Sequence, residues 1–290
     1  MAVVLLTGCS SGFGLEGALA FARNGDTVFA TMRDVSRARP LTDAATREGL
    51  TVRVRKLDVT EPETFAPLVA GVVAEAGGLD VLVNNAGVLR AGAFEDLSVD
   101  TVREVMDTNF TGPALLAQAA LPQMRRQRRG HIIMVSSLSG VAGLPGDVVY
   151  TASKFALEGA TEALRHEVDR WGIKVALIEA AMYATQIFAA RPTAALSSSI
   201  PKDSPYRPLI EQRLRELREK LPYALDPSRV GELMVEIAAS DGSRLRWPAD
   251  DVARRVLAKT FAQDDSARDG FLREVSGTDW WSAGEPSPRG

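Results

Sequence analysis

The sequence is poor in the residues that build disulfides and metal centres. Cys9 is the only cysteine among 290 residues, and there are two histidines, His131 and His166. A single cysteine cannot form an intrachain disulfide, which fits a reducing compartment, and we therefore expect a cytoplasmic protein. One cysteine and two histidines also fall short of the ligands of a usual zinc site. The sequence predicts neither a disulfide-stabilised fold nor a metal centre.

Long apolar runs and a strong charge of either sign are also missing. No apolar run reaches the roughly 20 residues that cross a membrane as a helix. The apolar residues 1–6 lack a preceding basic segment and run directly into a glycine turn, so we interpret them as a strand and not as a signal peptide. The net charge of −3 argues against a general polyanion-binding surface. Arg125–Arg129 is better explained as a solvated helix end than as a nucleic-acid site.

Short apolar runs alternate with amphipathic segments along the first 180 residues. The apolar runs predict buried strands at residues 3–6, 27–31, 52–57, 81–83, 132–135 and 174–178. The segments between them predict helices that end near Arg23 or cover 63–76, 99–127 and 150–171, with Pro113 and Pro122 kinking or interrupting the third. This alternation predicts an α/β fold with a doubly wound, mainly parallel sheet of Rossmann type and helices on both faces.

The segments that follow the predicted strands are rich in glycine and polar residues. They are the glycine turn after the first strand, Met32-Arg33, Asp58, Asn84–Gly87, Ser137 and Glu179–Thr185. Open parallel sheets bind their ligands beyond the carboxyl ends of the strands. The shared placement of these segments therefore predicts one binding site.

The glycine turn is the first of these segments. Thr7-Gly-Cys-Ser-Ser-Gly-Phe-Gly14 places glycines at 8, 12 and 14, between a strand and an amphipathic helix. Glycines let the backbone approach a pyrophosphate, which the N-terminus of the helix stabilises. The turn therefore predicts a dinucleotide site, although its spacing is Gly-x-x-x-Gly-x-Gly and not the usual Gly-x-Gly-x-x-Gly.

The end of the second strand bears on which dinucleotide is bound. Selection of NAD places an acidic residue there, whereas this chain has Met32 followed by Arg33. A guanidinium pairs with the oxygens of a 2′-phosphate, which favours NADP. The alternative is a solvated Arg33 with Asp34 binding the ribose. Asp58, after the third strand, either accepts a hydrogen bond from adenine or serves as a turn or cap residue.

Tyr150 and Lys154 are four residues apart on a predicted helix and therefore share a face. A phenol normally has a pKa near about 10, and an adjacent ammonium lowers it by favouring the phenolate. Ser137 follows a buried strand, so its hydroxyl and the Tyr150 phenol can converge on one oxygen atom. The alternative is a helix that carries tyrosine and lysine by chance.

Together, these motifs carry a family resemblance. The glycine turn, Asn84-Asn-Ala-Gly87, Asn109, Ser137 and Tyr150-x-x-x-Lys154 occur in an order and spacing that resemble the short-chain dehydrogenase/reductase family in its single-domain form. The likeness covers about residues 2–187. The segments Thr7–Gly12, Ala30–Asp34 and Tyr150–Gly159 are most similar to the branch that acts on steroids, retinoids and other bulky lipophilic alcohols.

The resemblance implies an NADP(H)-dependent oxidoreductase that interconverts a ketone and a secondary alcohol. Tyr150 would exchange the proton, Ser137 would hydrogen-bond the reacting oxygen, Lys154 would lower the pKa of Tyr150 and hold the nicotinamide ribose, and Asn109 would support a proton-supplying water. The implied cofactor residues are Gly8, Ser10, Ser11, Gly12, Phe13, Gly14, Arg33, Asp58, Val59, Asn85, Ala86, Gly87, Tyr150, Lys154 and Thr185.

The implied partners are a small lipophilic ketone or alcohol and further copies of the chain. We assign the substrate side of the site to Leu138, Leu144, Met182 and Phe188. The resemblance also implies a homodimer or homotetramer, paired through the helices at 99–127 and 150–171. We expect no nucleic-acid partner and no membrane span.

One departure from the family pattern lies after the sixth strand. The family usually has Pro-Gly where this chain has Ala180-Ala181, while Thr185 stays in place. If position 181 requires a positive φ, alanine there costs roughly 1–2 kcal/mol. The departure keeps two alternatives open: non-redox chemistry, such as cyclisation or isomerisation, on the same tyrosine, and a non-catalytic NADP(H)-binding protein.

The last third of the chain predicts a lid and a tail. Four prolines and a serine run precede an amphipathic helix at 209–221, so we interpret residues 187–225 as an insertion that closes over the substrate. The alternative is a helix packed permanently on the body. A helix at 230–239, a strand at 245–248 and a helix at 250–260 follow. Residues 1–281 form one predicted domain and 282–290 a disordered tail; Trp280 and Trp281 receive no assigned role.

Overall fold

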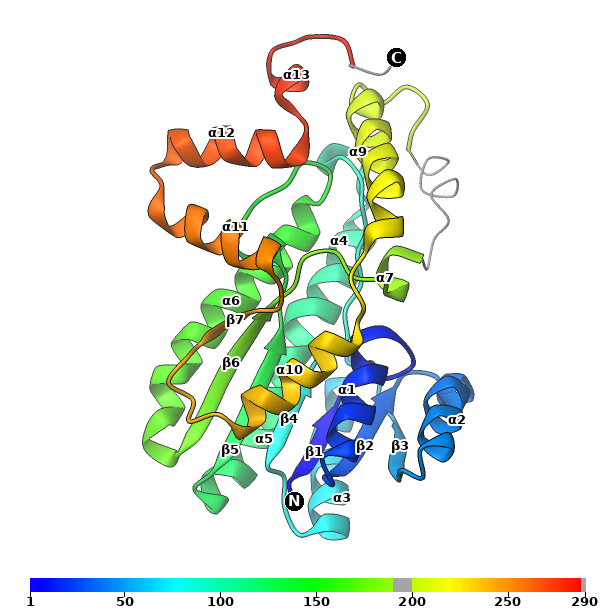
Figure 1. Ribbon diagram of the computed structural model, residues 1–290, viewed down its shortest axis with the longest axis vertical. Helices are drawn as coiled ribbons and strands as arrows, with labels where there is room; N and C mark the ends of the chain where they lie inside the picture. The colour runs from blue at the N-terminus through cyan, green and yellow to red at the C-terminus, as the bar shows by residue number, and fades with distance from the viewer. Residues whose placement is uncertain (190–199, 288–290) are drawn as a thin grey trace.

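The computed structural model describes residues 1–189 and 200–287. Within these residues, a parallel seven-stranded sheet with the order β3-β2-β1-β4-β5-β6-β7 forms the centre of the protein (Figure 1). The strands are β1 (Val3–Leu6), β2 (Thr27–Met32), β3 (Val52–Lys56), β4 (Val81–Asn84), β5 (Gly130–Val135), β6 (Ile173–Glu179) and β7 (Arg246–Pro248). The predicted doubly wound fold is confirmed.

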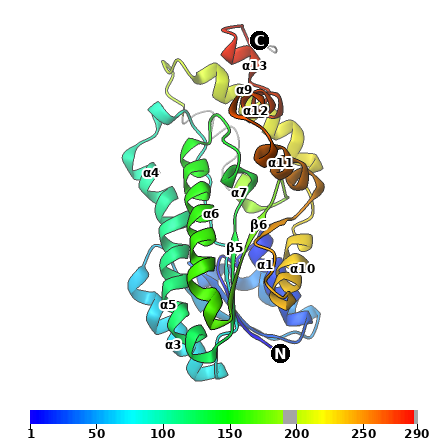
Figure 2. The same ribbon diagram turned by 90° about the vertical axis from the view of Figure 1, so that its left-hand side faces the viewer.

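Helices cover both faces of the sheet, which is why its central strands are almost wholly apolar. One face packs against α1 (Gly12–Arg23), α2 (Arg39–Arg47) and α10 (Ser228–Ala239). The other packs against α3 (Phe65–Ala76), α5 (Gly112–Gln127) and α6 (Val148–Val168). Figure 2 shows α3, α5 and α6 on one side of the strands and α1 and α10 on the other. All four residues of β1 are buried.

The predicted helix over 99–127 is wrong in one respect, because it is two helices joined by a π turn. α4 (Val99–Met106) ends before the turn Asp107–Thr111, and α5 follows it. The N–H of Gly112 bonds to the carbonyl of Asp107, five residues back. Pro113 has no N–H to offer the carbonyl of Asn109, four residues back, so a regular α-helix cannot continue there. Pro122 lies inside α5 without ending it.

Besides the short helices α7 (Gln186–Ala189) and α13 (Asp279–Ser282), two longer helices in the described part of the chain have no counterpart in the sequence prediction. α2 buries a narrow stripe of Leu41, Ala44 and Ala45 among charged residues, and α12 (Asp265–Ser276) follows α11 (Asp251–Ala262) near the C-terminus. α2 has only nine residues and most of them are polar, so its stability depends on the packing of this stripe against the body.

A further layer lies beyond the carboxyl ends of the strands, where α9 (Arg207–Lys220), α12 and α13 (Asp279–Ser282) gather (Figure 1). The amphipathic helix predicted at 209–221 is α9. The rest of the predicted insertion includes α7 (Gln186–Ala189), whereas residues 190–199 lie outside the described residues. Ile210 and Leu214 of α9 pack against Ala93 and Ile200. The lid itself, as a moving element, stays a prediction.

The C-terminus packs on this layer. Trp280 is 8% exposed and donates its indole N–H to the carbonyl of Gly277 at 3.0 Å. Glu285 donates its N–H to the carbonyl of Trp280 at 2.8 Å. Residues 288–290 of the predicted tail lie outside the described residues, and the disorder of the tail stays a prediction. Among the helices in the described part of the chain, none is both long and apolar enough to cross a bilayer.

The π turn that carries Asn109 packs closely against the backbone of Val59, which only the missing side chain of Gly112 permits. A Cβ on Gly112 would lie 2.1 Å from the carbonyl oxygen of Val59, whereas a Cβ on Gly71, inside α3, would meet nothing within 4 Å. We expect Gly112→Ala to lower the free energy of unfolding by about 1–3 kcal/mol through overpacking. The matched control Gly71→Ala should raise it by about 0.5–1 kcal/mol. Urea unfolding measures both, and an unchanged stability of Gly112→Ala would contradict this packing.

Candidate active site

The backbone conformation of the glycine turn requires glycine at these positions. Gly8 and Gly12 have φ values of +74° and +54°, in the left-handed region that favours glycine. A Cβ on Gly14 would lie 2.3 Å from the carbonyl oxygen of Gly8, and one on Gly8 would lie 2.9 Å from Cα of Ala86. The turn therefore brings bare backbone to the N-terminus of α1, as an anion site requires.

Hydrogen bonds join this turn to the segment that follows β4. The Thr7 hydroxyl accepts from the N–H groups of Asn85 at 2.9 Å and Ala86 at 3.0 Å. The Asn85 side chain donates to the carbonyl of Thr7 at 2.8 Å. A Cβ on Gly12 would lie 3.1 Å from Cβ of Thr185. The structure thus brings together three of the segments to which we assign the cofactor.

The residues assigned to the adenosine end lie at neighbouring strand ends. Arg33 is exposed and makes no hydrogen bond within the described residues. The Asp34 carboxylate already accepts from the N–H and the hydroxyl of Ser36, at 3.0 and 2.7 Å. Asp58 accepts in the same way from Thr60, at 3.0 and 2.8 Å, and Val59 behind it is buried. The two aspartates therefore stabilise turns, and Arg33 is the charged side chain left free to bind a ligand.

Ser137 and Tyr150 face the same cavity, as their positions predict. Ser137 lies two residues beyond β5, and Tyr150 lies in the first turn of α6. Both line a cavity of about 590 Å³, and an interaction with the Ser137 hydroxyl lowers the pKa of the Tyr150 phenol, against the effect of burial. The Ser137 hydroxyl also accepts from the N–H of Ser139 at 3.2 Å. A substrate oxygen in this cavity could therefore meet both hydroxyls.

Lys154 lies behind Tyr150 and is anchored to the sheet. Its ammonium donates to the carbonyl of Val135 at 2.8 Å and lies 5.8 Å from the centre of the Tyr150 ring. Its Nζ lies 3.9 Å from where a Cβ on Gly87 would be. The lysine therefore stands between the tyrosine and the segment that follows β4.

Asn109 is fully buried in the π turn and holds two elements together. Its side-chain oxygen accepts from the N–H of Val88 at 2.8 Å, and its amide donates to the carbonyl of Val88 at 2.9 Å. The amide also donates to the Ser153 hydroxyl at 3.1 Å, and that hydroxyl donates to the carbonyl of Tyr150 at 2.7 Å. The asparagine side chain thus links the β4 segment to the helix that carries Tyr150.

The electrostatics of Tyr150 differ from the sequence prediction. Burial raises the pKa of Tyr150 to about 12; the hydrogen bond with Ser137 opposes this shift and the charge of Asp147 adds to it. Burial lowers the pKa of Lys154 to about 8, and the carboxylate of Glu158 opposes that shift. The net shift of the Tyr150 pKa is therefore upward, opposite to the lowering expected from Lys154, because desolvation of the phenolate dominates. The effect of the Lys154 charge itself stays a prediction.

Two buried acidic residues near Lys154, Glu158 and Glu179, were not predicted from the sequence. Glu158 accepts from Nε of Arg246 at 2.9 Å. Glu179, at the end of β6, is fully buried, and neither of its carboxylate oxygens has a hydrogen-bond partner among the described residues. Burial, together with the charge of Glu158, raises the pKa of Glu179 to about 8, while Arg246 opposes the shift. The available signal was spacing, since Glu158 lies four residues after Lys154 on one helix face.

The rest of the cavity is largely apolar. Leu138, Leu144 and Met182, which we assigned to the substrate, line it, whereas the side chain of Phe188 lies outside the described residues. The predicted insertion at 187–225 contributes α9 and the turn after it, although no residue of that helix was assigned to the substrate from the sequence. Those lining residues are Ile210, Arg213, Leu214, Leu217, Lys220 and Tyr223.

The loop after β6 is unstrained, contrary to the cost considered for Ala181. Arg128 is the one non-glycine residue with positive φ in the described part of the chain, so Ala181 pays no such penalty. The N–H of Ala181 donates to the Asp250 carboxylate at 3.1 Å, and the Tyr183 hydroxyl donates to the carbonyl of Ala249 at 3.2 Å. The Tyr183 ring packs edge-on against Phe13 at 5.1 Å. These contacts fix the loop without the family's Pro-Gly.

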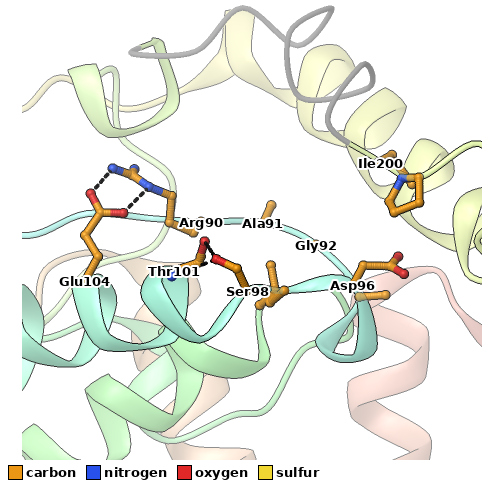
Figure 3. A pocket seen from close by; sticks show the side chains of 11 residues that line it. Arg90, Ala91, Gly92, Asp96, Ser98, Thr101, Glu104 and Ile200 are labelled. Carbon is orange, nitrogen blue, oxygen red and sulfur yellow. Dashed lines mark hydrogen bonds and ion pairs between the residues drawn. The ribbon is translucent and has the colours of Figure 1, made fainter.

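A second, smaller cavity of about 220 Å³ lies between α4 and residues 200–201. Figure 3 shows Arg90 turned toward Glu104 and Ser98 toward Thr101, with Asp96 apart from both pairs. Arg90 forms an ion pair with Glu104, and Ser98 bonds to Thr101. Because these groups satisfy one another, this cavity offers less to a ligand than the one that holds Ser137 and Tyr150.

Comparison with known proteins agrees with the fold and the site. The family model for short chain dehydrogenases matches residues 2–195, and the chain belongs to this family of nicotinamide-dependent oxidoreductases. It is 37% identical to bovine retinol dehydrogenase 8 over 252 residues, which cover 84% of this chain and 80% of that protein.

A steroid enzyme and a solved structure are similar to the chain as well. The chain is 35% identical to mouse 17-beta-hydroxysteroid dehydrogenase type 1 over 254 residues, covering 84% of this chain and 72% of that one. A crystal structure of a short-chain dehydrogenase from Streptomyces avermitilis superposes with a TM-score of 0.75 at 30% identity and covers 98% of this chain and 97% of that one. The predicted resemblance to the hydroxysteroid and retinol dehydrogenase branch is confirmed.

Because the pKa of Glu179 is raised, we expect the free energy of unfolding to depend on pH. The folded state holds this proton up to about pH 8, whereas the unfolded chain releases it near pH 4.5, so protonation favours folding. The stabilisation is complete below about pH 4.5 and is lost as the pH rises to about 8, by up to roughly 1.4 kcal/mol per pH unit. Relative to wild type, Glu179→Gln should therefore gain stability across this window and stay level above it.

Glu162→Gln is the matched control for this measurement. The Glu162 carboxylate accepts a hydrogen bond from Arg246, the arginine nearest Glu179, at 2.8 Å. This bond lowers the pKa of Glu162. Its replacement should therefore bring no gain with rising pH. Urea unfolding between pH 5 and pH 9 compares the two variants. Parallel pH profiles of wild type and Glu179→Gln would show that Glu179 titrates normally.

Proposed function

We propose that the protein is an NADP(H)-dependent oxidoreductase that interconverts a ketone and a secondary alcohol on a bulky lipophilic substrate. The observation that carries this proposal is the convergence of Ser137 and Tyr150 on one largely apolar cavity, with Lys154 anchored behind the tyrosine. In this proposal Tyr150 is the general acid in reduction and the general base in oxidation.

The residues of the cofactor side fit a phosphorylated dinucleotide. The left-handed glycines at 8 and 12 expose backbone at the N-terminus of α1, which suits a pyrophosphate. The free guanidinium of Arg33 suits a 2′-phosphate. Asn85–Gly87 and Thr185 would border the same molecule. When bound, NADP(H) supplies or accepts the hydride.

The chain's own residues supply the proton transfer. In reduction, the Ser137 hydroxyl would orient the ketone oxygen while the Tyr150 hydroxyl gives up its proton to it. The phenolate left behind is costly in a buried site, as the raised pKa of Tyr150 shows. The ammonium of Lys154 would offset this cost and return a proton, which its pKa of about 8 permits near neutrality. Asn109 would hold the β4 segment and α6 at the distance this relay needs.

The substrate class follows from the size and lining of the cavity. A volume of about 590 Å³ lies within the usual range for small-molecule sites, and leucine, isoleucine and methionine side chains make up much of its wall. The named activities of the retinol and hydroxysteroid relatives concern large apolar alcohols, which agrees with this lining. Since Ala181 is unstrained, the departure that kept non-redox chemistry and a non-catalytic binder open no longer favours either.

The cytoplasmic location and the homodimer or homotetramer stay predictions. α4, α5 and α6 lie on one side of the molecule (Figure 2), and Val148 and Phe155 of α6 are 41% and 40% exposed. An exposed apolar helix face of this kind is compatible with pairing through these helices.

Removal of the phenol hydroxyl tests the proposed acid. Tyr150→Phe should lower turnover of a lipophilic ketone by about a thousandfold, because no other group can donate from that position. NADPH affinity should stay within about twofold. Loss of nicotinamide absorbance follows turnover, and cofactor fluorescence follows binding. Tyr206→Phe is the matched control, since Tyr206 bonds to Glu95 away from the cavity. Undiminished turnover by Tyr150→Phe would refute the role.

Replacement of Arg33 tests the choice of cofactor. Arg33→Ala should reduce the preference for NADPH over NADH, measured as a ratio of dissociation constants, by about tenfold or more, because a charge-assisted bond is lost. Arg37→Ala, another exposed arginine close by, and Asp34→Asn should leave the ratio nearly unchanged. An unchanged ratio in Arg33→Ala, or NADH preferred by the wild type, would contradict the assignment.

A further inference from the structure

The largely apolar cavity contains a charged pair near the catalytic tyrosine. Asp147 lies immediately before α6, Arg213 lies on α9, and both line the cavity. Their closest side-chain atoms, Oδ2 of Asp147 and Nη2 of Arg213, are 3.9 Å apart, which is too far for a direct hydrogen bond. The two side chains are 19% and 20% exposed. Lys220, the other charged residue of the lining, is exposed.

The carboxylate of Asp147 has no hydrogen-bond donor among the described residues. It makes no cap bond to the start of α6, although its position before the helix would allow one. Desolvation of a carboxylate without a donor is unfavourable. Burial raises the pKa of Asp147 to about 6, with Arg213 opposing the shift, so the group is still mostly ionised at neutral pH. The cavity therefore presents an unused hydrogen-bond acceptor.

Arg213 is held in place from its other side. Its Nη1 donates to the carbonyl of Ser276 at 3.2 Å and lies 3.5 Å from the Glu216 carboxylate. The Nη2 end is left facing Asp147. Fixed donors on one side of a gap and a free acceptor on the other form a dipolar pocket within the larger cavity.

This pocket lies close to the reacting group. Asp147 and Tyr150 are three residues apart at the start of one helix, so their side chains are neighbours. Both side chains line the same cavity, and the negative charge of Asp147 adds to the rise in the pKa of Tyr150. A substituent that reaches the pair must therefore lie next to the substrate carbonyl and not at the far end of the molecule.

We propose that Asp147 and Arg213 form a subsite for a hydroxyl group that the substrate carries beside its reacting carbonyl, so that the preferred substrate is a lipophilic hydroxyketone. This inference rests on the proposed ketone reduction. A hydroxyl donates to Asp147 and accepts from Arg213. A carboxylate would be repelled by Asp147, an ammonium would be repelled by Arg213, and a methylene group would leave both unpaired.

A matched series of ketones tests the subsite. The probes are nonyl methyl ketone, its α-hydroxy and α-amino derivatives, and the β-keto acid of the same chain length. The wild type should favour the hydroxyketone over the parent ketone in kcat/KM by about tenfold or more. Asp147→Asn should reduce this ratio by about tenfold. Because both ketones use Tyr150, the ratio cancels any effect of the variant on proton transfer.

Variants of the arginine and a control complete the design. Arg213→Gln alone leaves two carboxylates uncompensated and could unfold the protein. Arg213→Lys, which keeps the charge, and the double variant Asp147→Asn with Arg213→Gln, which removes both charges, avoid this problem. The double variant should lose the hydroxyketone preference, and Arg213→Lys should keep part of it. Arg218→Gln, an exposed arginine of α9 outside the cavity, should match the wild type.

The outcomes separate this inference from the proposed function. A wild-type ratio near one, a preference for the amino ketone or the keto acid, or an unchanged ratio in Asp147→Asn would overturn the subsite while leaving ketone reduction intact. If no ketone is reduced, the proposed function fails, and calorimetry on the NADPH-loaded protein decides the subsite. Tighter binding of the hydroxyketone than of the parent ketone, lost in Asp147→Asn, would support it; equal binding would overturn it.

Discussion

The close crossing of the glycine turn and the segment after β4 is the contact on which the site depends. The Thr7 hydroxyl accepts two backbone hydrogen bonds from that segment, and bare glycine backbone fills the space between them. The crossing occurs where β1 and β4 are neighbours, so that the strand order reverses. It fixes the two segments assigned to the cofactor relative to each other before any ligand is present.

The catalytic group is organised around the end of β5 in the same way. Ser137 continues from that strand, and Lys154 donates to the carbonyl of Val135, the last residue of the strand. Ser137 and Lys154 are thus both positioned by the end of β5, and Tyr150 lies between them on α6. Asn109 then ties α6 to the segment after β4 through Val88 and Ser153. One network therefore connects the predicted acid to the predicted cofactor side.

Much of this arrangement could be predicted, because it follows from local patterns. Apolar runs indicate buried strands, and the carboxyl ends of parallel strands lie at one edge of the sheet. This rule predicts that the glycine turn, Ser137 and the nearby Tyr150 lie in one site. Contacts between distant segments could not be predicted. The loop at Ala181 is fixed by Asp250 and by the carbonyl of Ala249, which lie 69 and 66 residues beyond their partners Ala181 and Tyr183, and no local pattern indicates these contacts.

Electrostatics was the least predictable level, for a related reason. The spacing of Tyr150 and Lys154 indicates attraction between phenolate and ammonium but not how deeply each group is buried, and burial proved the larger effect on both pKa values. Glu179, at the end of β6, is likewise a buried acidic group without a hydrogen-bond donor in the described residues, and Asp147 makes no cap bond at the start of α6.

Carboxylates that face an arginine at 3.9 Å without a hydrogen bond to it lower the stability of the folded chain, and sites of binding and catalysis are where such costs are commonly retained. Asp147 differs from Glu179 in one respect, because it lines the cavity and a ligand can reach it. A ligand that gives Asp147 a donor stabilises the folded state by the full cost it relieves, in addition to its own contacts. The same buried charge can therefore weaken the empty protein and sharpen its choice of substrate.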